Sequence, residues 1–222
     1  MASLNPNFEN KLNELLKRLK ANARSVVVLN IAESVKKDEI KGILDYFMSY
    51  LKDGTLCVVG DCEFNTVHSN LKSLSSLSEK QRKYIYTPVE LRLMGLYEGA
   101  RFSNHPSVEI ACAGKYAQFL VRHQSLDFPY GKRSIFADFY DLDAIYLSIG
   151  ETGKPYPLKY DKDLDDKVVF RNQCLYDDKL YAYLDTEFDY EDASEKFESL
   201  SLFEEANIKI YGERYRYLID HI

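Results

Sequence analysis

The 222-residue sequence contains no tryptophan, only four cysteines and four histidines, and no long apolar run. A membrane-spanning helix needs about 20 consecutive apolar residues, so we predict that no segment crosses or binds a membrane. The first ten residues lack the apolar stretch of a secretory signal, and we therefore expect a cytoplasmic protein. Since the cysteines form no Cys-x-x-Cys pair, we expect no metal site.

An excess of positive charge is also absent. The chain has 29 Lys and Arg against 35 Asp and Glu, a net charge of −6. Proteins that bind the phosphate backbone are usually basic, so we predict no nucleic-acid partner. With 45% hydrophobic and 29% charged residues, the composition is that of a folded globular chain. The length suits one large domain, which we place at residues 1–222.

The hydrophobic pattern alternates between helices and strands in the first two thirds of the chain. Apolar residues recur at helical spacing over Asn5–Leu19 and Lys36–Leu51, whereas Ser25–Leu29 and Thr55–Val59 are continuous apolar runs of strand length. A strand, a helix and a second strand at this spacing predict a parallel pair of buried strands.

Further helices and strands are expected in the rest of the chain. The pattern predicts helices over Thr87–Gly99, Lys115–Arg122, Ser134–Phe139, Tyr190–Leu200 and Glu213–Ile222, and strands over Ala144–Ile149, Lys167–Cys174, Lys179–Leu184 and Ile208–Tyr211. We therefore predict an α/β fold with a mostly parallel central sheet, flanked by helices, and an antiparallel C-terminal addition.

Two of the histidines lie outside the predicted helices and could carry chemistry. His105, in the string Arg101-Phe102-Ser103-Asn104-His105-Pro106, could bind an anion or carry a proton together with Arg101. The alternative is an imidazole that bonds the backbone of its own loop. His68 opens a serine-rich stretch that could offer donors to a phosphate, and the alternative is a solvated loop.

A basic turn and two cysteines complete the candidates. Lys132 and Arg133 precede Ser134, which is expected to cap a helix, so the turn could bind a phosphate or be an ordinary surface turn. Cys57 and Cys112 lie among apolar or small residues, and we interpret them as small core residues.

Several short motifs occur in a characteristic order. The order is Gly54-Thr55-Leu56, then Thr87-Pro88 with Gly95, Arg101 and His105-Pro106, then Ser107–Gly114 with Ala117, Leu120 and His123 as a helix, then Gly131–Ser134, the strand Ala144–Gly150, and Phe203–Ile222. In this order the chain resembles the aminoglycoside 3-N-acetyltransferase family. These enzymes use acetyl-CoA and differ in fold from the GNAT acetyltransferases.

The resemblance implies roles for particular residues. The loop Asn30–Ser34 stands where the family has an HSS-type loop that contacts CoA, so Asn30 and Ser34, with Lys132, Arg133 and Ser134, are expected to bind an acyl-CoA. Tyr160 falls about where the family carries its catalytic His. His105 and Tyr160 are therefore the candidate catalytic residues.

The resemblance leaves two hypotheses for the activity. In the first, the chain is an acyl-CoA-dependent N-acyltransferase whose acceptor is an amino sugar, a nucleotide-linked amino sugar or an aminoglycoside, with Arg101, Asn104 and His68 on the substrate. Because a phenol with its usual pKa near 10 is a poor base at pH 7, His105 or His68 would take the proton. In the second, the chain is a degenerate relative that binds or assembles without catalysis. Formation of a homo-oligomer stays open.

Overall fold

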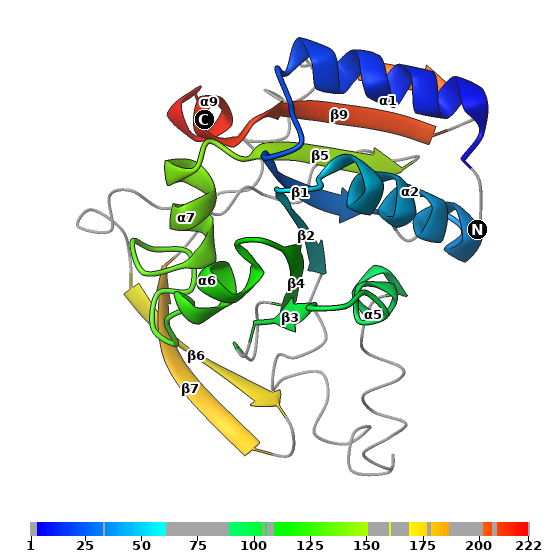
Figure 1. Ribbon diagram of the computed structural model, residues 1–222. Coiled ribbons are helices and arrows are strands. Elements are labelled where there is room, and N and C mark those ends of the chain that lie inside the picture. Colours follow the sequence, from blue (N-terminus) through cyan, green and yellow to red (C-terminus); the bar gives the residue numbers. More distant parts are fainter. Residues whose placement is uncertain are drawn as a thin grey trace.

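In the computed structural model of the chain, helices cover both faces of one open, strongly twisted sheet (Figure 1). The structure describes residues 4–32, 34–60, 89–103, 105, 109–150, 160, 169–176, 179–186, 202–205 and 208–221. The sheet strands are β1 (Val26–Ile31), β2 (Thr55–Gly60), β3 (Arg101–Phe102), β4 (Glu109–Gly114), β5 (Ile145–Gly150), β8 (Leu202–Glu205) and β9 (Ile208–Arg214). The helices are α1 (Pro6–Arg18), α2 (Lys37–Tyr50), α5 (Val89–Met94), α6 (Ala117–Arg122), α7 (Ile135–Asp141) and α9 (Tyr215–His221).

The strands lie in the order β3-β4-β2-β1-β5-β9-β8. The parallel pair predicted from the strand–helix–strand spacing is confirmed, since β1 runs parallel to β2, and β1 is also parallel to β5. The α/β class with flanking helices is likewise confirmed. The expected predominance of parallel pairing is wrong outside this centre, because β2–β4, β3–β4, β5–β9 and β8–β9 are all antiparallel.

The main difference from the sequence prediction is strand β4. The stretch from Ser107 to Gly114 was expected to be helical, whereas Glu109–Gly114 forms a six-residue strand paired to β2 along its whole length. Its central residues, Ile110 to Ala113, are all buried. A short run of apolar and small residues has no period that separates a buried strand from a helix, so pairing with β2 decides the outcome.

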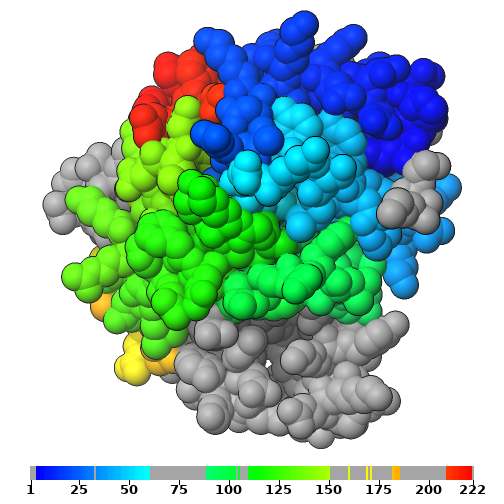
Figure 2. All heavy atoms as spheres, in the orientation of Figure 1, coloured from blue at the N-terminus to red at the C-terminus, as the bar shows by residue number. Residues whose placement is uncertain are grey.

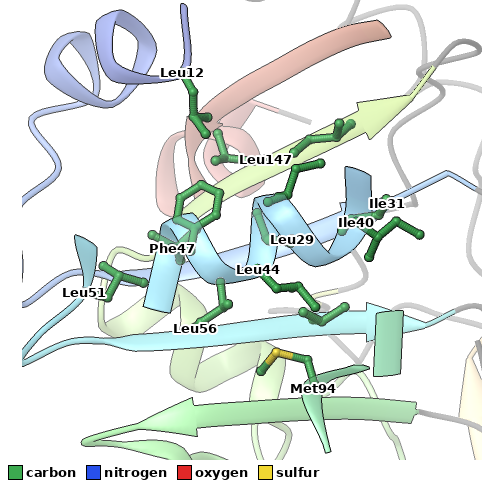
Figure 3. Close-up of a cluster of buried hydrophobic side chains, with 14 of the residues drawn as sticks. Leu12, Leu29, Ile31, Ile40, Leu44, Phe47, Leu51, Leu56, Met94 and Leu147 are labelled. Carbon is green, nitrogen blue, oxygen red and sulfur yellow. The ribbon is translucent and has the colours of Figure 1, made fainter. Parts of the chain in front are cut away.

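Two hydrophobic cores lie on the two faces of the sheet. Helices α1, α2 and α5 cover the first, where Leu12, Phe47 and Met94 pack against inward-facing strand residues (Figure 3). Helices α6, α7 and α9 cover the second, around Phe139 and Tyr215. On the surface, the blue segment with α1 lies at the top, the cyan segment with α2 below it, and the green segment with α5 and α6 below that (Figure 2). Burial from both faces is why β1 and β2 are continuous apolar runs.

Two predicted helix starts are confirmed by their capping hydrogen bonds. The side-chain oxygen of Asn5 accepts a 2.9 Å hydrogen bond from the backbone nitrogen of Asn7, and Pro6 occupies the first turn of α1. Ser134 caps α7 in the same way. Such caps satisfy backbone donors that have no partner inside the helix.

The antiparallel hairpin predicted near the end of the chain is present as β6 (Val169–Tyr176) and β7 (Lys179–Thr186), although it forms a sheet of its own. Two hydrogen bonds of Leu184 in β7 attach the hairpin to the segment before α7. The Phe128 nitrogen donates to the Leu184 oxygen at 2.7 Å, and the Leu184 nitrogen donates to a carboxylate oxygen of Asp127 at 2.9 Å. The predicted helix Tyr190–Leu200 lies outside the described residues.

The junction of β2 and β4 gives a stability prediction. Gly114 has a φ of +117°, and a Cβ there would collide with the carbonyl oxygen of Gly54. Gly114→Ala should therefore lower the free energy of unfolding by about 2–4 kcal/mol, as measured by urea denaturation. The matched control is Gly99→Ala, where φ is +76° but no atom lies within 4 Å, and about 1 kcal/mol of backbone strain is expected. Equal losses at the two sites would contradict this account.

Candidate functional site

The three parallel strands define one edge of the sheet as the place to look for a site. Strands β1, β2 and β5 run in the same direction, so their carboxyl ends at Ile31, Gly60 and Gly150 meet at that edge. The chain after β1 stays against β5, since the Ala32 nitrogen donates to the Ile149 oxygen at 2.8 Å. Ligands of open α/β sheets bind beside the carboxyl ends of the strands.

A row of polar side chains crosses this end of the sheet. Asn30 of β1, Ser148 of β5 and Tyr211 of β9 are direct neighbours in register. Their alternation with residues of the first core puts all three on the face that α6, α7 and α9 cover. Asn30 and Tyr211 are half-buried and Ser148 is buried. Of these residues, Asn30 was predicted as a site residue, whereas Ser148 and Tyr211 were not, because the register between distant strands is not visible in a sequence.

Ser34 lies at the same edge, exposed in the turn that links β1 to α2. This turn is closed by the Val35 nitrogen, which donates to the Ala32 oxygen at 3.0 Å. Of the two residues predicted on the loop after the first strand, Asn30 belongs to β1 itself and Ser34 to the turn that follows, so both lie at this end of the sheet.

The basic turn reaches this end of the sheet from above the second face. The turn is tied to the segment that precedes it, since the Ser125 nitrogen donates to the Arg133 oxygen at 2.9 Å, and the next residue, Leu126, has its oxygen 3.0 Å from Nε2 of His105. This contact puts the turn near the start of β4, which lies opposite the carboxyl end of β2. Lys132 and Arg133 are exposed. Ser134 is buried; its Oγ donates to the Gly131 oxygen at 2.6 Å and accepts from the Ala137 nitrogen at 3.3 Å. Its side chain thus fixes the turn.

His105 is buried, with 4% of its surface exposed. Its Nε2 lies 3.0 Å from the Leu126 carbonyl oxygen, and its ring meets the Tyr183 ring edge-on at 5.1 Å. Because a carbonyl oxygen only accepts, Nε2 carries the proton of the neutral imidazole. Burial lowers the pKa of His105 below its usual value, and the Leu126 hydrogen bond opposes that shift in part. His105 is therefore a neutral, fixed side chain near the start of β4.

Tyr160 occupies a different region. It is half-buried against Tyr140, with ring centroids 5.3 Å apart, beside the second core. Tyr140 belongs to the carboxyl-terminal half of α7, which lies toward the amino end of β5. Tyr160 therefore lies toward the amino end of β5, whereas His105 lies toward the carboxyl end of β2. The two predicted catalytic residues are at opposite ends of the parallel strands.

The remaining predicted substrate residues are only partly described. Arg101 is exposed on the short strand β3, and its guanidinium donates to the Ala100 oxygen at 2.9 Å. Asn104 and His68 lie outside the described residues.

One contact between a histidine and a carboxylate was not predicted from the sequence. His123, which caps the end of α6, has its Nδ1 3.1 Å from a carboxylate oxygen of Asp138 in α7. Burial raises the pKa of Asp138, while the hydrogen bond and charge of His123 act in the opposite direction. This contact joins the end of α6 to α7 at the protein surface.

Neither a metal centre nor a membrane span emerges from the part of the chain that the structure describes. No three His, Cys, Asp or Glu side chains there come together as metal ligands. None of the helices in that part has the length and apolarity to cross a bilayer.

The burial of His105 predicts a pH dependence of stability. Because its pKa is lowered in the folded state, the unfolded chain binds the proton first as pH falls below about 6.5, and the folded state loses stability on acidification. His105→Asn should lose less stability than the wild type between pH 7.5 and pH 5, as measured by urea denaturation. The exposed His221 provides the control His221→Asn, which should follow the wild type. Identical profiles for all three proteins would contradict the prediction.

Comparison with known proteins shows a similarity in sequence over part of the chain and a similarity in fold over nearly all of it. Residues 93–154 match the sequence pattern of the aminoglycoside 3-N-acetyltransferases. No curated protein sequence matches the chain. Solved structures match almost all of it, at low identity.

Three of these structures illustrate the similarity. The YokD protein from Bacillus subtilis is 15% identical, with a TM-score of 0.67 over 96% of this chain and 90% of its own. AAC-IIIb in a binary complex with CoASH is 13% identical, with a TM-score of 0.68 over 95% and 92%. AAC-VIa with bound sisomicin is 14% identical, with a TM-score of 0.68 over 96% and 94%. The resemblance predicted from the motif order is confirmed: the chain has the fold of the aminoglycoside 3-N-acetyltransferases, and residues 93–154 carry their sequence pattern.

Proposed function

We propose that this protein is an acyl-CoA-dependent N-acyltransferase whose acceptor is an amino group of an amino sugar, a nucleotide-linked amino sugar or an aminoglycoside. The observation that carries the proposal is the family's sequence pattern over residues 93–154 within a fold matched over nearly the whole chain. That segment contains His105, the basic turn and strand β5. Among the similar structures, AAC-IIIb binds CoASH and AAC-VIa binds sisomicin.

The acyl-CoA is assigned to the basic turn and the loop after β1. Lys132 and Arg133 are exposed cations, and CoA carries phosphate groups that such side chains bind through charge-assisted hydrogen bonds. Asn30 and Ser34 offer neutral donors at the same end of the sheet. In this assignment Ser134 contributes by holding the turn in shape.

The acceptor amine is assigned to Ser148 and Tyr211 of the polar row and to Arg101, with Asn104 and His68 kept as predicted ligands. A net charge of −6 favours the approach of a cationic amine, which must then lose a proton to attack. The amine nitrogen forms a bond to the thioester carbonyl carbon, the carbon–sulfur bond breaks, and CoA leaves as its thiol. Since His105 lies near the carboxyl ends of the strands and Tyr160 does not, the proposal gives the proton-accepting role to His105.

The alternative is a relative that binds CoA or an amino sugar without turning it over. The observation in its favour is the burial of His105 and the hydrogen bond of its Nε2 to Leu126, which is the geometry of a structural histidine. The acyltransferase and the binding protein would have the same fold, and only the acyltransferase would release CoA thiol in the presence of an amine.

The first test is a calorimetric titration with acetyl-CoA. The wild type should bind with a micromolar dissociation constant, and Lys132→Ala/Arg133→Ala should bind at least tenfold more weakly, since tenfold corresponds to about 1.4 kcal/mol. The matched control is Lys17→Ala/Lys52→Ala, which removes two exposed cations from elsewhere on the surface and should leave the affinity unchanged. No binding by the wild type at millimolar acetyl-CoA would refute the acyltransferase proposal.

The second test is acyl transfer to a panel of amino sugars and aminoglycosides, followed by the release of free CoA thiol. His105→Asn should lower kcat by about 100-fold or more, because general bases contribute 10²–10⁴, while the acetyl-CoA affinity stays within a few fold. The conservative Tyr160→Phe should retain turnover. Acetyl-CoA binding with no transfer to any amine would favour the binding protein, and full activity of His105→Asn would remove His105 from the chemistry.

A further inference from the structure

Two free thiols face each other inside the sheet. Cys57 lies on β2 and Cys112 on β4, directly opposite each other in register. Neither has any exposed surface, and both point into the second core. Their sulfur atoms are 2.7 Å apart. Their interpretation as small core residues is confirmed, and the structure adds that the two side chains are in direct contact.

The hydrogen bonds of the sheet identify which kind of cross-strand pair they form. The Lys115 nitrogen donates to the Gly54 oxygen at 2.9 Å, so Gly54 and Lys115 are a hydrogen-bonded pair. Such pairs alternate with non-hydrogen-bonded ones along an antiparallel ladder, which makes the pair three steps further on, Cys57 and Cys112, non-hydrogen-bonded.

The opposite side of β4 supports the same assignment. The Ser103 nitrogen donates to the Ile110 oxygen at 2.9 Å, so Ser103 and Ile110 are a hydrogen-bonded pair, and so are Arg101 and Cys112 two residues away. The backbone groups of Cys112 therefore point toward β3 and away from Cys57. In non-hydrogen-bonded pairs the Cα atoms are about 4.5 Å apart and the side chains close together, which is within the range of about 4.4–6.8 Å that a disulfide requires.

We propose that Cys57 and Cys112 are a redox-reactive pair that closes into a cross-strand disulfide when the protein meets hydrogen peroxide. One thiolate attacks a peroxide oxygen, the O–O bond breaks, and a sulfenic acid and hydroxide form. The second sulfur then attacks the sulfenic sulfur, and water leaves as the S–S bond forms. In total, two thiols and one peroxide give one disulfide and two waters.

Burial decides which oxidants can take part. It raises the pKa of Cys57, so little thiolate is present in the closed protein and the reaction is slow compared with that of an exposed thiol. A bulky disulfide such as oxidised glutathione would have to form a mixed disulfide inside a filled core. Hydrogen peroxide has nearly the size of water and needs only a small opening. Of the described strands, only the two-residue β3 lies beyond β4, so this is the side where such an opening is easiest.

The cross-link would enclose residues 57–112, which include Arg101 and His105. Closing a loop of this length restricts the unfolded chain, so the oxidised protein should melt at a temperature higher by roughly 5–10 °C. This inference does not depend on the proposed acyltransferase activity.

The test uses the variant Cys62→Ser/Cys174→Ser, which keeps only the proposed pair. The native variant is treated with hydrogen peroxide, denatured, alkylated and analysed by mass spectrometry. The expected product has lost two hydrogens, takes up no alkylating reagent until reduced, yields a Cys57–Cys112 cross-linked peptide after proteolysis, and shows the raised melting temperature. Oxidised glutathione at the same molar concentration as the peroxide should form the Cys57–Cys112 disulfide far more slowly.

The controls separate the pair from its surroundings. Cys112→Ala in the same background leaves Cys57 without a partner, so peroxide should give no loss of two hydrogens and no rise in melting temperature. If a variant fails to fold, the same experiment can be done on the wild type, because a Cys57–Cys112 cross-linked peptide can be mapped there directly after peroxide treatment. Two fully alkylatable thiols after peroxide treatment, oxidation to sulfinic acid instead of a disulfide, or a cross-link only in denatured protein would each overturn the proposal.

Discussion

The burial of strand β1 from both faces is the constraint on which the rest of the structure depends. Val27 and Leu29 face the core under α1 and α2, and Val26 and Val28 face the core under α7 and α9. Each such side chain contributes about 1.5–3 kcal/mol of burial free energy before the entropy of ordering is subtracted. Strand β1 also pairs with β2 on one side and β5 on the other. The helices on both faces therefore pack on β1 or on strands of the sheet that β1 joins.

This arrangement fixes where a site can lie. Parallel pairing brings the carboxyl ends of β1, β2 and β5 to one edge, and the hydrogen bonds of Ser125 and Leu126 hold the basic turn near His105, close to the end of β2. The antiparallel strands β4 and β9 then bring residues from distant parts of the sequence, His105 and Tyr211, toward the edge from both sides. The candidate site is therefore a consequence of strand direction more than of any local motif.

Local signals predicted the parts of the fold that local interactions decide. The cap of α1 at Asn5, the cap of α7 at Ser134 and the apolar runs of β1 and β5 need only neighbouring residues, and all were found as expected. Strand β4 was taken for a helix because its identity depends on pairing with β2. The alignment of Asn30 with Ser148 and Tyr211 was missed for the same reason, since the register of these strands joins residues far apart in the sequence.

The same limit applies to the chemistry of single residues. The sequence shows that His105 precedes a proline. It does not show that Nε2 of His105 is hydrogen-bonded to the Leu126 carbonyl oxygen, or that burial lowers the pKa of His105. A buried imidazole with a lowered pKa is neutral at pH 7, which a base requires, yet it is also a weaker base and harder to reach. Two contacts of His105 act differently: the Tyr183 ring of β7 helps to bury the imidazole, and burial lowers its pKa, whereas the hydrogen bond to Leu126 opposes that shift. The hairpin β6–β7 therefore contributes to keeping this imidazole neutral at pH 7.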